Sequence, residues 1–447
     1  MIVSKNKNGP VVLVSCDITY TFPLSYPYLA SYLIAQGEDV RVFFKEGNLQ
    51  NIVNQIMLLK PLVVGFGSLY PELKQNREMI EMLNKAGRDF PIIVGGQMVS
   101  PIPEFAIEIT GADIGVIGEG EITLDRIVKA LRRNNSIFDI KGLVIKEGNK
   151  FTNTGVGDYI EDLTKLPPVQ YDLFPAEKWL PIGKYYRNTQ WHWDEADRVI
   201  NVHGGRGCPY NCNFCYHHSK PRYRPVNIMM EEASDALKRF DGNVLYFSDD
   251  TVLCSPNRAK QIVKGIENLD RKVGYSVSSR IDILSRMDDS TLIDMKNSGC
   301  RVIGIGIESG SDRILQTIGK NYTTEMVVSV IKRLARIGIF VTTSIMVGQL
   351  TETKADAKAS LELLKTILKI DPQIQFACTY TCPYPGSPLY DYILAKHRIK
   401  SHRDFYDIFF HSGREYKVNF SAMSDQEVTE MVLLLEGTWR EMFQKRV

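Results

Sequence analysis

The chain has 447 residues, of which 44% are hydrophobic, and 54 lysines and arginines oppose 52 acidic residues to give a formal net charge of +2. At roughly 150 residues per domain, this length predicts two or three domains with ordinary globular cores. So balanced a charge lacks the excess of basic residues that is typical of nucleic-acid binding. No apolar run reaches the roughly 20 residues that a membrane-spanning helix needs.

Short β-rich runs alternate with helical patterns in residues 1–135, which predicts a doubly wound, Rossmann-like α/β domain. Gly37, Gly87 and Gly111 stand where helices are expected to end. The strands are predicted over Val11–Cys16, Asp39–Phe44, Leu62–Gly67, Pro91–Gly95 and Asp113–Ile117, and helices over Tyr28–Gln36, Pro71–Ala86 and Glu121–Arg132.

Ligands of doubly wound sheets bind at the carboxyl ends of the strands. In this domain those ends carry small residues, which leave room for a broad, flat group. The first strand is not followed by Gly-x-Gly-x-x-Gly, so a dinucleotide is a poor candidate. The predicted ligand contacts at this edge are Thr19, Ser68, Leu69, Gly95, Gly96, Gln97, Gly118, Glu119 and Gly120.

Residues 136–195 are predicted to be a connector that contains a hairpin, and the βα alternation restarts in residues 196–395. Six βα-type repeats predict a complete or partial β/α barrel with its site at the strand ends. Residues 396–447 are predicted to be a short tail that ends in an amphipathic helix. The barrel strands are predicted over Val199–Gly204, Asn243–Ser248, Val273–Ser278, Arg301–Ile307, Phe340–Val347 and Gln373–Tyr380.

Cysteine use and the amino-terminal segment both bear on the cellular compartment. Eight cysteines in a chain of this length are too few for a disulfide scaffold. The apolar stretch before Cys16 is shorter than the roughly 7–15 residues of a signal-peptide core. We therefore expect a cytoplasmic protein.

Three of the cysteines, Cys208, Cys212 and Cys215, are bunched directly after the first predicted barrel strand. Four thiolates are the norm for closing a zinc or four-iron site, so three on one tight loop would leave one iron open to a substrate or cofactor. A zinc ion completed by His217 or His218 is the alternative.

The segment Gly207–Cys215, with the sequence GCPYNCNFC, resembles the Cys-x3-Cys-x2-Cys loop of radical S-adenosylmethionine (SAM) enzymes, including the aromatic Phe214 before the third cysteine. The resemblance covers about residues 195–395. It implies a 4Fe–4S cluster on the three cysteines, with SAM on the open iron. An electron would cleave SAM to a 5′-deoxyadenosyl radical, so an external donor such as a flavodoxin or ferredoxin is implied.

The resemblance also implies SAM contacts at the later strand ends. Asp249 and Asp250 stand where the family has a segment near the methionine ammonium, and Arg280 suits the methionine carboxylate as a bidentate donor. The full set of implied SAM contacts is Phe214, Asp249, Asp250, Ser278, Arg280, Glu308 and Gly348.

Two of these positions follow the fourth and fifth strands. The family's residue at Glu308 often meets the ribose hydroxyls or the methionine moiety, and at Gly348 the backbone approaches adenine. The usual Pro-Gly-Glu-Thr after that glycine is replaced here by Gln349–Thr353, a departure that weakens only that contact.

Structural roles are the alternative for several of these residues. Asp249 and Asp250 could cap the following helix, and Glu308 could pair with a nearby base such as Arg280. Tyr216 beside the cluster loop, Asp250, and Cys382 past the sixth strand are candidate catalytic residues. For Tyr216 and Cys382, packing and an inert thiol are the alternatives.

The first domain resembles the cobalamin-binding domain that precedes the barrel in one radical SAM subfamily, through Gly95-Gly96, Ala112–Glu121 and Leu163–Pro168. The resemblance implies that the predicted edge residues contact cobalamin. No histidine precedes His192, so the domain has no Asp-x-His-x-x-Gly motif. Any cobalamin would therefore be bound without a histidine from this domain on its lower face.

Together the resemblances imply a cobalamin-dependent methyltransferase that acts on an unactivated carbon, or phosphorus, of a small molecule or peptide. Cobalamin would lie between the two domains, and SAM would serve both to remethylate it and to generate the radical. One alternative is a radical SAM cyclase, dehydratase, epimerase or other rearranging enzyme without methyl transfer. The other is a cobalamin-binding sensor or carrier that is not an enzyme.

Overall fold

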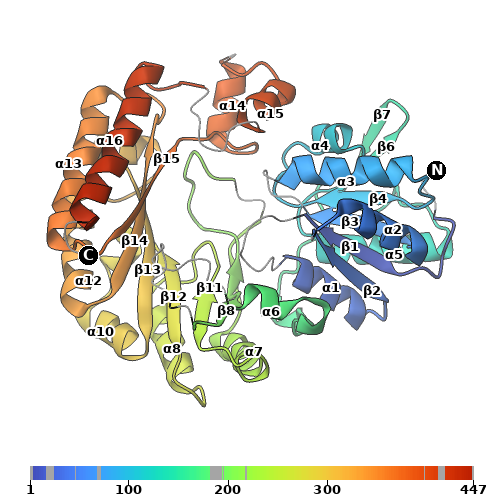
Figure 1. Cartoon of the computed structure of the whole chain (residues 1–447), viewed down its shortest axis with the longest axis horizontal. Coiled ribbons are helices and arrows are strands. Elements are labelled where there is room, and N and C mark those ends of the chain that lie inside the picture. Colours follow the sequence, from blue (N-terminus) through green and yellow to red (C-terminus); the bar gives the residue numbers. More distant parts are fainter. Residues whose placement is uncertain are drawn as a thin grey trace. The chain divides into compact units, whose positions relative to one another are not determined.

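The computed structural model describes residues 4–16, 25–45, 47–67, 72–181, 194, 196–216, 219–396, 398–410 and 418–444. The chain divides into two compact α/β units, Met1–Ala176 and Glu177–Val447 (Figure 1). Within the described ranges, no helix is long and apolar enough to cross a membrane.

The first unit is built on one seven-stranded sheet. Its strands are β1 (Val11–Ser15), β2 (Val40–Phe44), β3 (Val63–Gly67), β4 (Ile92–Gly95), β5 (Ile114–Val116), β6 (Leu143–Glu147) and β7 (Lys150–Asn153). Its helices are α1 (Ser25–Ala35), α2 (Leu49–Leu59), α3 (Leu73–Lys85), α4 (Pro103–Thr110) and α5 (Gly120–Arg133). The strand order is β2-β1-β3-β4-β5-β6-β7, with β1 to β5 parallel.

Helices cover both faces of this sheet, which explains why every residue of β1 is buried. One face packs on α1 and α5 through residues such as Leu33 and Ile127, and the other packs on α2, α3 and α4 through Val53 and Ile80. The five predicted strands are all present, with ends that differ by a residue or two. Gly111 ends α4 in the left-handed conformation (φ 76°), as its position predicted.

The hairpin that we predicted in the connector is part of the first sheet. Strand β6 pairs antiparallel with β5, with Ile145 opposite Ile114, and β7 pairs with β6. Leu143, Val144 and Ile145 are fully buried and contribute to the core on both faces. The first unit therefore extends to residue 176, well beyond the last βα repeat.

The second unit is a partial β/α barrel. Its strands are β8 (Val199–Val202), β9 (Gly205–Arg206), β10 (Arg222–Tyr223), β11 (Val244–Phe247), β12 (Gly274–Ser279), β13 (Cys300–Glu308), β14 (Phe340–Val347) and β15 (Gln375–Tyr380). The helices after the short α6 (Ala176–Trp179) are α7 (Val226–Arg239), α8 (Pro256–Glu267), α9 (Ile281–Leu284), α10 (Asp289–Asn297), α11 (Asp312–Thr317), α12 (Thr324–Ile337), α13 (Lys354–Ile370), α14 (Pro388–Ala395), α15 (His402–Phe410) and α16 (Asp425–Gln444). Six parallel strands follow one another in chain order from β8 and β11 to β15. Helix α16 of the predicted tail lies on the outer side of this sheet, where Trp439 Nε1 donates to the carbonyl of Ile374 (3.0 Å).

Alternation along the strands separates the helix-packed face from the concave face of this sheet. Tyr275 points outward, because its hydroxyl donates to a backbone carbonyl of α10 (3.1 Å). Its neighbours Ser276 and Ser278 therefore face the concave side. Ser278 pairs in register with Gly304, and Gly304 with Thr342. Small side chains thus line the concave face and leave space for a ligand.

Candidate functional site

The three clustered cysteines lie on one loop between β9 and β10. Gly207 begins it with φ +74°, and a Cβ there would lie 2.6 Å from the carbonyl oxygen of Ser219, so only glycine fits. Cys212 is buried, while Cys208 and Cys215 are half-buried. The loop leaves the carboxyl end of β8, which is the ligand-binding end of such a sheet.

The donor set on this loop fits a cluster. A single zinc ion needs all its thiolates within about 2.3 Å of one point, whereas a four-iron cluster takes one thiolate per iron. His217 and His218, the predicted alternative zinc ligands, lie outside the described residues.

Two distant segments hold the middle of the cysteine loop. The Asn213 N–H donates to the carbonyl of Ile318 (3.1 Å), and the Leu389 N–H at the start of α14 donates to the carbonyl of Asn213 (2.8 Å). Gly319, with φ +79°, packs against the loop so closely that a Cβ would lie 2.8 Å from the carbonyl oxygen of Asn211.

The substitution Gly319→Ala is expected to lower the iron and sulfide content of the purified protein several-fold. The new Cβ meets loop backbone, which cannot rotate away, and the left-handed conformation adds strain of about 1–2 kcal/mol. Gly338→Ala is the matched control, because Gly338 has φ +81° but its nearest neighbour, Lys296 Cε, would be 3.8 Å away. Equal iron loss in both variants would contradict the assignment of this contact to the loop.

Arg280, predicted as a SAM contact, lies directly against the cysteine loop. Its Nη1 donates to Cys212 Sγ (3.5 Å), its guanidinium carbon stands 3.6 Å from the Tyr210 ring centroid, and its Nε donates to Asp282 (2.8 Å). The Nη2 group is buried and has no hydrogen-bond partner among the residues that the structure describes. A buried, unpartnered donor next to a cysteine sulfur fits an anionic ligand such as the SAM carboxylate.

Asp249 supports the turn before the cysteine loop. Its Oδ1 accepts from the N–H groups of Gly204 (2.8 Å) and Gly205 (2.7 Å), and His203 Nδ1 lies 3.3 Å away. Burial raises the pKa of Asp249 to about 7. These contacts give Asp249 a structural role different from the helix cap that we considered, and they leave the neighbouring Asp250 exposed at the strand end.

Glu308 ends β13 in a strained conformation. A bulge interrupts the pairing between Gly306 and Glu308, and Glu308 has φ +67°, the left-handed region that a side chain rarely adopts. The carboxylate is buried and accepts from Lys320 Nζ (3.2 Å). A basic partner is therefore present, but it is Lys320 and not the expected Arg280, which pairs with Asp282.

Gly348 begins a tight loop after β14. Its N–H donates to Glu352 Oε2 (2.6 Å), as does the N–H of Gln349 (3.0 Å). The side chains of Gln349 and Glu352 are fully buried, and burial raises the pKa of Glu352 to about 7. Glu352 lies in the segment that departs from the family pattern, and it holds the backbone at Gly348.

The substitution Glu352→Gln is expected to remove part of the pH dependence of stability. Because the folded pKa lies above the ordinary value of 4.5, the stabilising contribution of Glu352 is complete below pH 4.5 and is lost as the pH rises through about 7. The melting temperature of the wild type should therefore fall between pH 5 and pH 8 relative to that of the variant. An equal change of melting temperature with pH in the wild type and the variant would contradict this role of Glu352.

Glu427→Gln is the control of opposite sign. The Ser424 N–H and the Lys354 ammonium hold the pKa of Glu427 down, at about 2. Its contribution is therefore present above pH 4.5, so this variant should melt lower than the wild type at pH 8.

The remaining predicted residues of the barrel lie near the carboxyl ends of its strands. Phe214 and Tyr216 are half-buried on the loop, and Ser278 lines the concave face. Cys382 follows β15, and burial raises its pKa to about 12, so it is a neutral thiol at physiological pH. Lys320 was not predicted, because lysine is normally a surface residue and its burial depends on a partner twelve positions away.

Glycines end the strands at the carboxyl edge of the first sheet. Among the predicted cobalamin contacts, Gly96 (φ +101°) and Gly118 (φ +90°) adopt left-handed turns. Ser100 joins their loops: its Oγ donates to the Gly96 carbonyl (3.1 Å) and accepts from the Gly118 N–H (3.0 Å). Ser100 was not predicted, because only the folded turns bring it between the two glycines.

Glu119 of the predicted set has a local role, since it is buried and accepts from the Ile160 N–H (3.2 Å). Gly120 packs against Leu29, where a Cβ would lie 2.9 Å from Leu29 Cδ2. Gly95 is half-buried and Gln97 exposed. This edge presents backbone and small side chains, which suits a broad, flat group. The other predicted contacts, Thr19, Ser68 and Leu69, lie outside the described residues.

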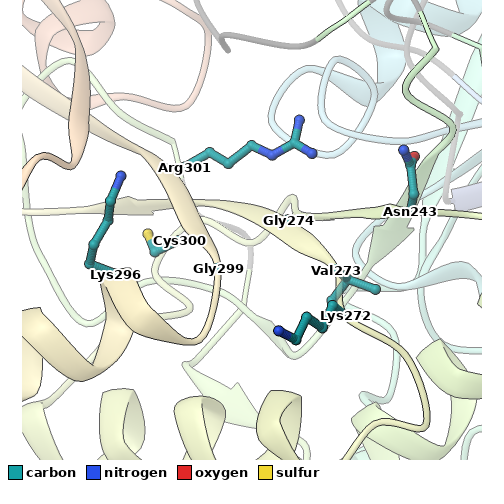
Figure 2. Close-up of a pocket in the computed structure, with 8 residues that line it drawn as sticks. All are labelled: Asn243, Lys272, Val273, Gly274, Lys296, Gly299, Cys300 and Arg301. Atoms are coloured by element: carbon teal, nitrogen blue, oxygen red, sulfur yellow. The ribbon is translucent and has the colours of Figure 1, made fainter.

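A cavity of about 410 Å³ opens at the amino ends of β11, β12 and β13, opposite the cysteine loop. Figure 2 shows Arg301 extending toward Asn243, and Arg301 forms an ion pair with Asp197 (2.6 Å), while Lys296 donates to the carbonyl of Gly338 (2.5 Å). Two of the three cations that line the cavity, Arg301 and Lys296, are thus committed to protein groups. The lining residues are Asn243, Lys272, Val273, Gly274, Lys296, Gly299, Cys300 and Arg301.

Comparison with known proteins supports both resemblances. Residues 202–364 match the Radical SAM superfamily, and residues 10–128 match the B12 binding domain. The chain is 28% identical over 383 residues to an uncharacterized methyltransferase of Pyrococcus horikoshii. The match covers 83% of this chain and 78% of that protein. It is 23% identical over 382 residues to the anaerobic magnesium-protoporphyrin IX monomethyl ester cyclase of Rubrivivax gelatinosus. That match covers 82% of this chain and 65% of the cyclase.

The fold is also similar to a solved structure. The radical S-adenosylmethionine methyltransferase TsrM from Kitasatospora setae, with cobalamin and a 4Fe–4S cluster bound, superposes with a TM-score of 0.69 at 17% sequence identity. The match covers 87% of this chain and 75% of that chain. At this identity the similarity establishes the arrangement of elements, a B12-binding type of domain followed by a radical SAM barrel.

Proposed function

This chain is a radical SAM enzyme with a B12-binding domain, and we propose that it methylates an unactivated carbon of a small molecule or peptide. The observation that carries the proposal is the three-cysteine loop at the carboxyl end of β8, with Arg280 on the sulfur of Cys212. When bound, the cluster and SAM supply a 5′-deoxyadenosyl radical, and cobalamin supplies a transferable methyl group.

The residues of the second unit have separable tasks in this proposal. Cys208, Cys212 and Cys215 would each hold one iron. Arg280 would direct Nη2, which lacks a partner among the described residues, to the SAM carboxylate. The small residues of the concave face, such as Gly304, would accommodate the length of SAM. Because the cluster must be reduced, we infer an external electron donor such as a flavodoxin or ferredoxin.

In the first unit, the glycines at the strand ends would support the corrin ring from the backbone. Gly96 and Gly118, held together by Ser100, form the best-defined part of this edge. The relative named as a methyltransferase, which matches 83% of this chain, also favours methyl transfer.

A test that needs no substrate uses the anaerobic full-length protein with titanium(III) citrate and SAM, with and without hydroxocobalamin. We expect 5′-deoxyadenosine in both reactions, and S-adenosylhomocysteine with methylated cobalamin only when cobalamin is present. Absence of 5′-deoxyadenosine would refute radical chemistry, and bound cobalamin without either product would indicate a sensor or carrier.

A second candidate is a radical rearrangement, such as ring closure, without methyl transfer. The similarity to the Rubrivivax gelatinosus cyclase over 82% of this chain favours it. In the same experiment this candidate predicts 5′-deoxyadenosine without S-adenosylhomocysteine, so the two products separate the candidates.

A further inference from the structure

Lys320 lies where the cysteine loop meets the strained end of β13. Lysine is rarely buried, yet this side chain is only 8% exposed. Its Nζ donates to Glu308 Oε1 (3.2 Å) and lies 5.8 Å from the ring centroid of Phe214 and 6.0 Å from that of Tyr322. A buried ammonium costs free energy unless it is paired, and the group that pairs with Lys320 is the carboxylate of Glu308.

The neighbours of Lys320 connect it to both sides of the site. Gly319 packs on the backbone of the cysteine loop. On the other side, the Tyr322 hydroxyl donates to the carbonyl of Gly306 (2.7 Å), within the bulge that precedes Glu308. Residues 319–322 therefore join the cluster loop to the end of β13.

Glu308 needs such support. A side chain in the left-handed region is strained and persists only where its surroundings enforce it. In the described ranges, Lys320 is the ion-pair partner of Glu308. The hydrogen bond from Lys320 to Oε1 holds the carboxylate of Glu308 and thereby fixes the direction of its other oxygen, Oε2.

We propose that Lys320 is a positioning residue of the SAM site, which holds the Glu308 carboxylate so that its second oxygen meets the bound cofactor. The inference rests on the proposed radical SAM function. Because Lys320 acts through Glu308, its effect on SAM binding depends on that carboxylate. Its effect is independent of the thiolates that hold the cluster.

The test is a double-mutant cycle on the anaerobic, cluster-loaded full-length protein, with Kd for SAM measured by equilibrium dialysis. Lys320→Met is expected to weaken SAM binding by about 10–100-fold while iron and sulfide content stay at the wild-type level. In a Glu308→Gln background, Lys320→Met should have no further effect, because the group through which it acts is already altered. Lys320→Arg should restore most of the affinity.

Lys260→Met is the matched control, since Lys260 pairs with Asp288 at the same distance of 3.2 Å but on an exposed surface of the same unit. Equal weakening by Lys320→Met in both backgrounds, or none in either, would overturn the proposal, as would loss of iron from that variant. Wild-type protein that bound no SAM would instead refute the proposed function, and it would do so before any substitution was made.

Discussion

Replacing Cys212 with serine is expected to abolish 5′-deoxyadenosine formation and to leave protein with little iron or sulfide after anaerobic reconstitution. A soft thiolate is the ligand that iron–sulfur clusters require, and a hydroxyl does not replace it. Cys212 is also buried against Arg280, so the variant loses a ligand at the best-enclosed point of the loop. Iron and sulfide analysis, together with product quantification under titanium(III) citrate, would measure both effects.

Cys300→Ser is the control for this experiment. Cys300 is equally buried in the same unit, but it lies at the opposite end of the sheet, and burial raises its pKa to about 12. The control should keep both the cluster and the activity. Full iron content and full 5′-deoxyadenosine formation in the Cys212 variant would refute the assignment of the cluster to this loop.

The second large effect is expected for Arg280→Met. Loss of the guanidinium removes a hydrogen bond to Cys212 and the donor that we assign to the SAM carboxylate. We expect SAM affinity to fall at least about tenfold, since hydrogen bonds to charged groups contribute about 1.5–3 kcal/mol. The midpoint potential of the cluster should become more negative by tens of millivolts, because positive charge and hydrogen bonds near cluster sulfurs favour the reduced form.

Arg280→Lys separates charge from geometry. The ammonium keeps the charge but lacks the planar fork that lets one guanidinium meet Cys212 and a carboxylate together. This variant should therefore keep a midpoint potential close to the wild-type value while its SAM affinity stays reduced. An Arg280→Met protein with both properties unchanged would contradict the role that we assign to the guanidinium.

Local sequence signals predicted most of what the structure shows. The βα alternation located the strands of both sheets. In the first sheet, parallel strands buried on two faces produce continuous apolar runs. The cysteine spacing located the loop after β8, and the position of Arg280 at a strand end brought it to that loop. These features depend on residues that are close together in the sequence.

The remaining features depend on long-range geometry. The support that Asp249 gives to the Gly204–Gly205 backbone exists only once two strands are adjacent. The bulge at Glu308 breaks the two-residue period on which a strand prediction relies, and only then does Lys320 become its partner. The role of Glu352 likewise required knowledge of the turn that brings its carboxylate back to the Gly348 N–H.

The antiparallel hairpin on the first sheet also determines where this protein can be divided. A fragment that ended at residue 135 would leave the edge of β5 unpaired and would uncover the core that Leu143, Val144 and Ile145 fill. An apolar, unpaired edge strand is a template for aggregation. The B12-binding half should therefore be separated near residue 176, some forty positions after its repeating pattern has stopped.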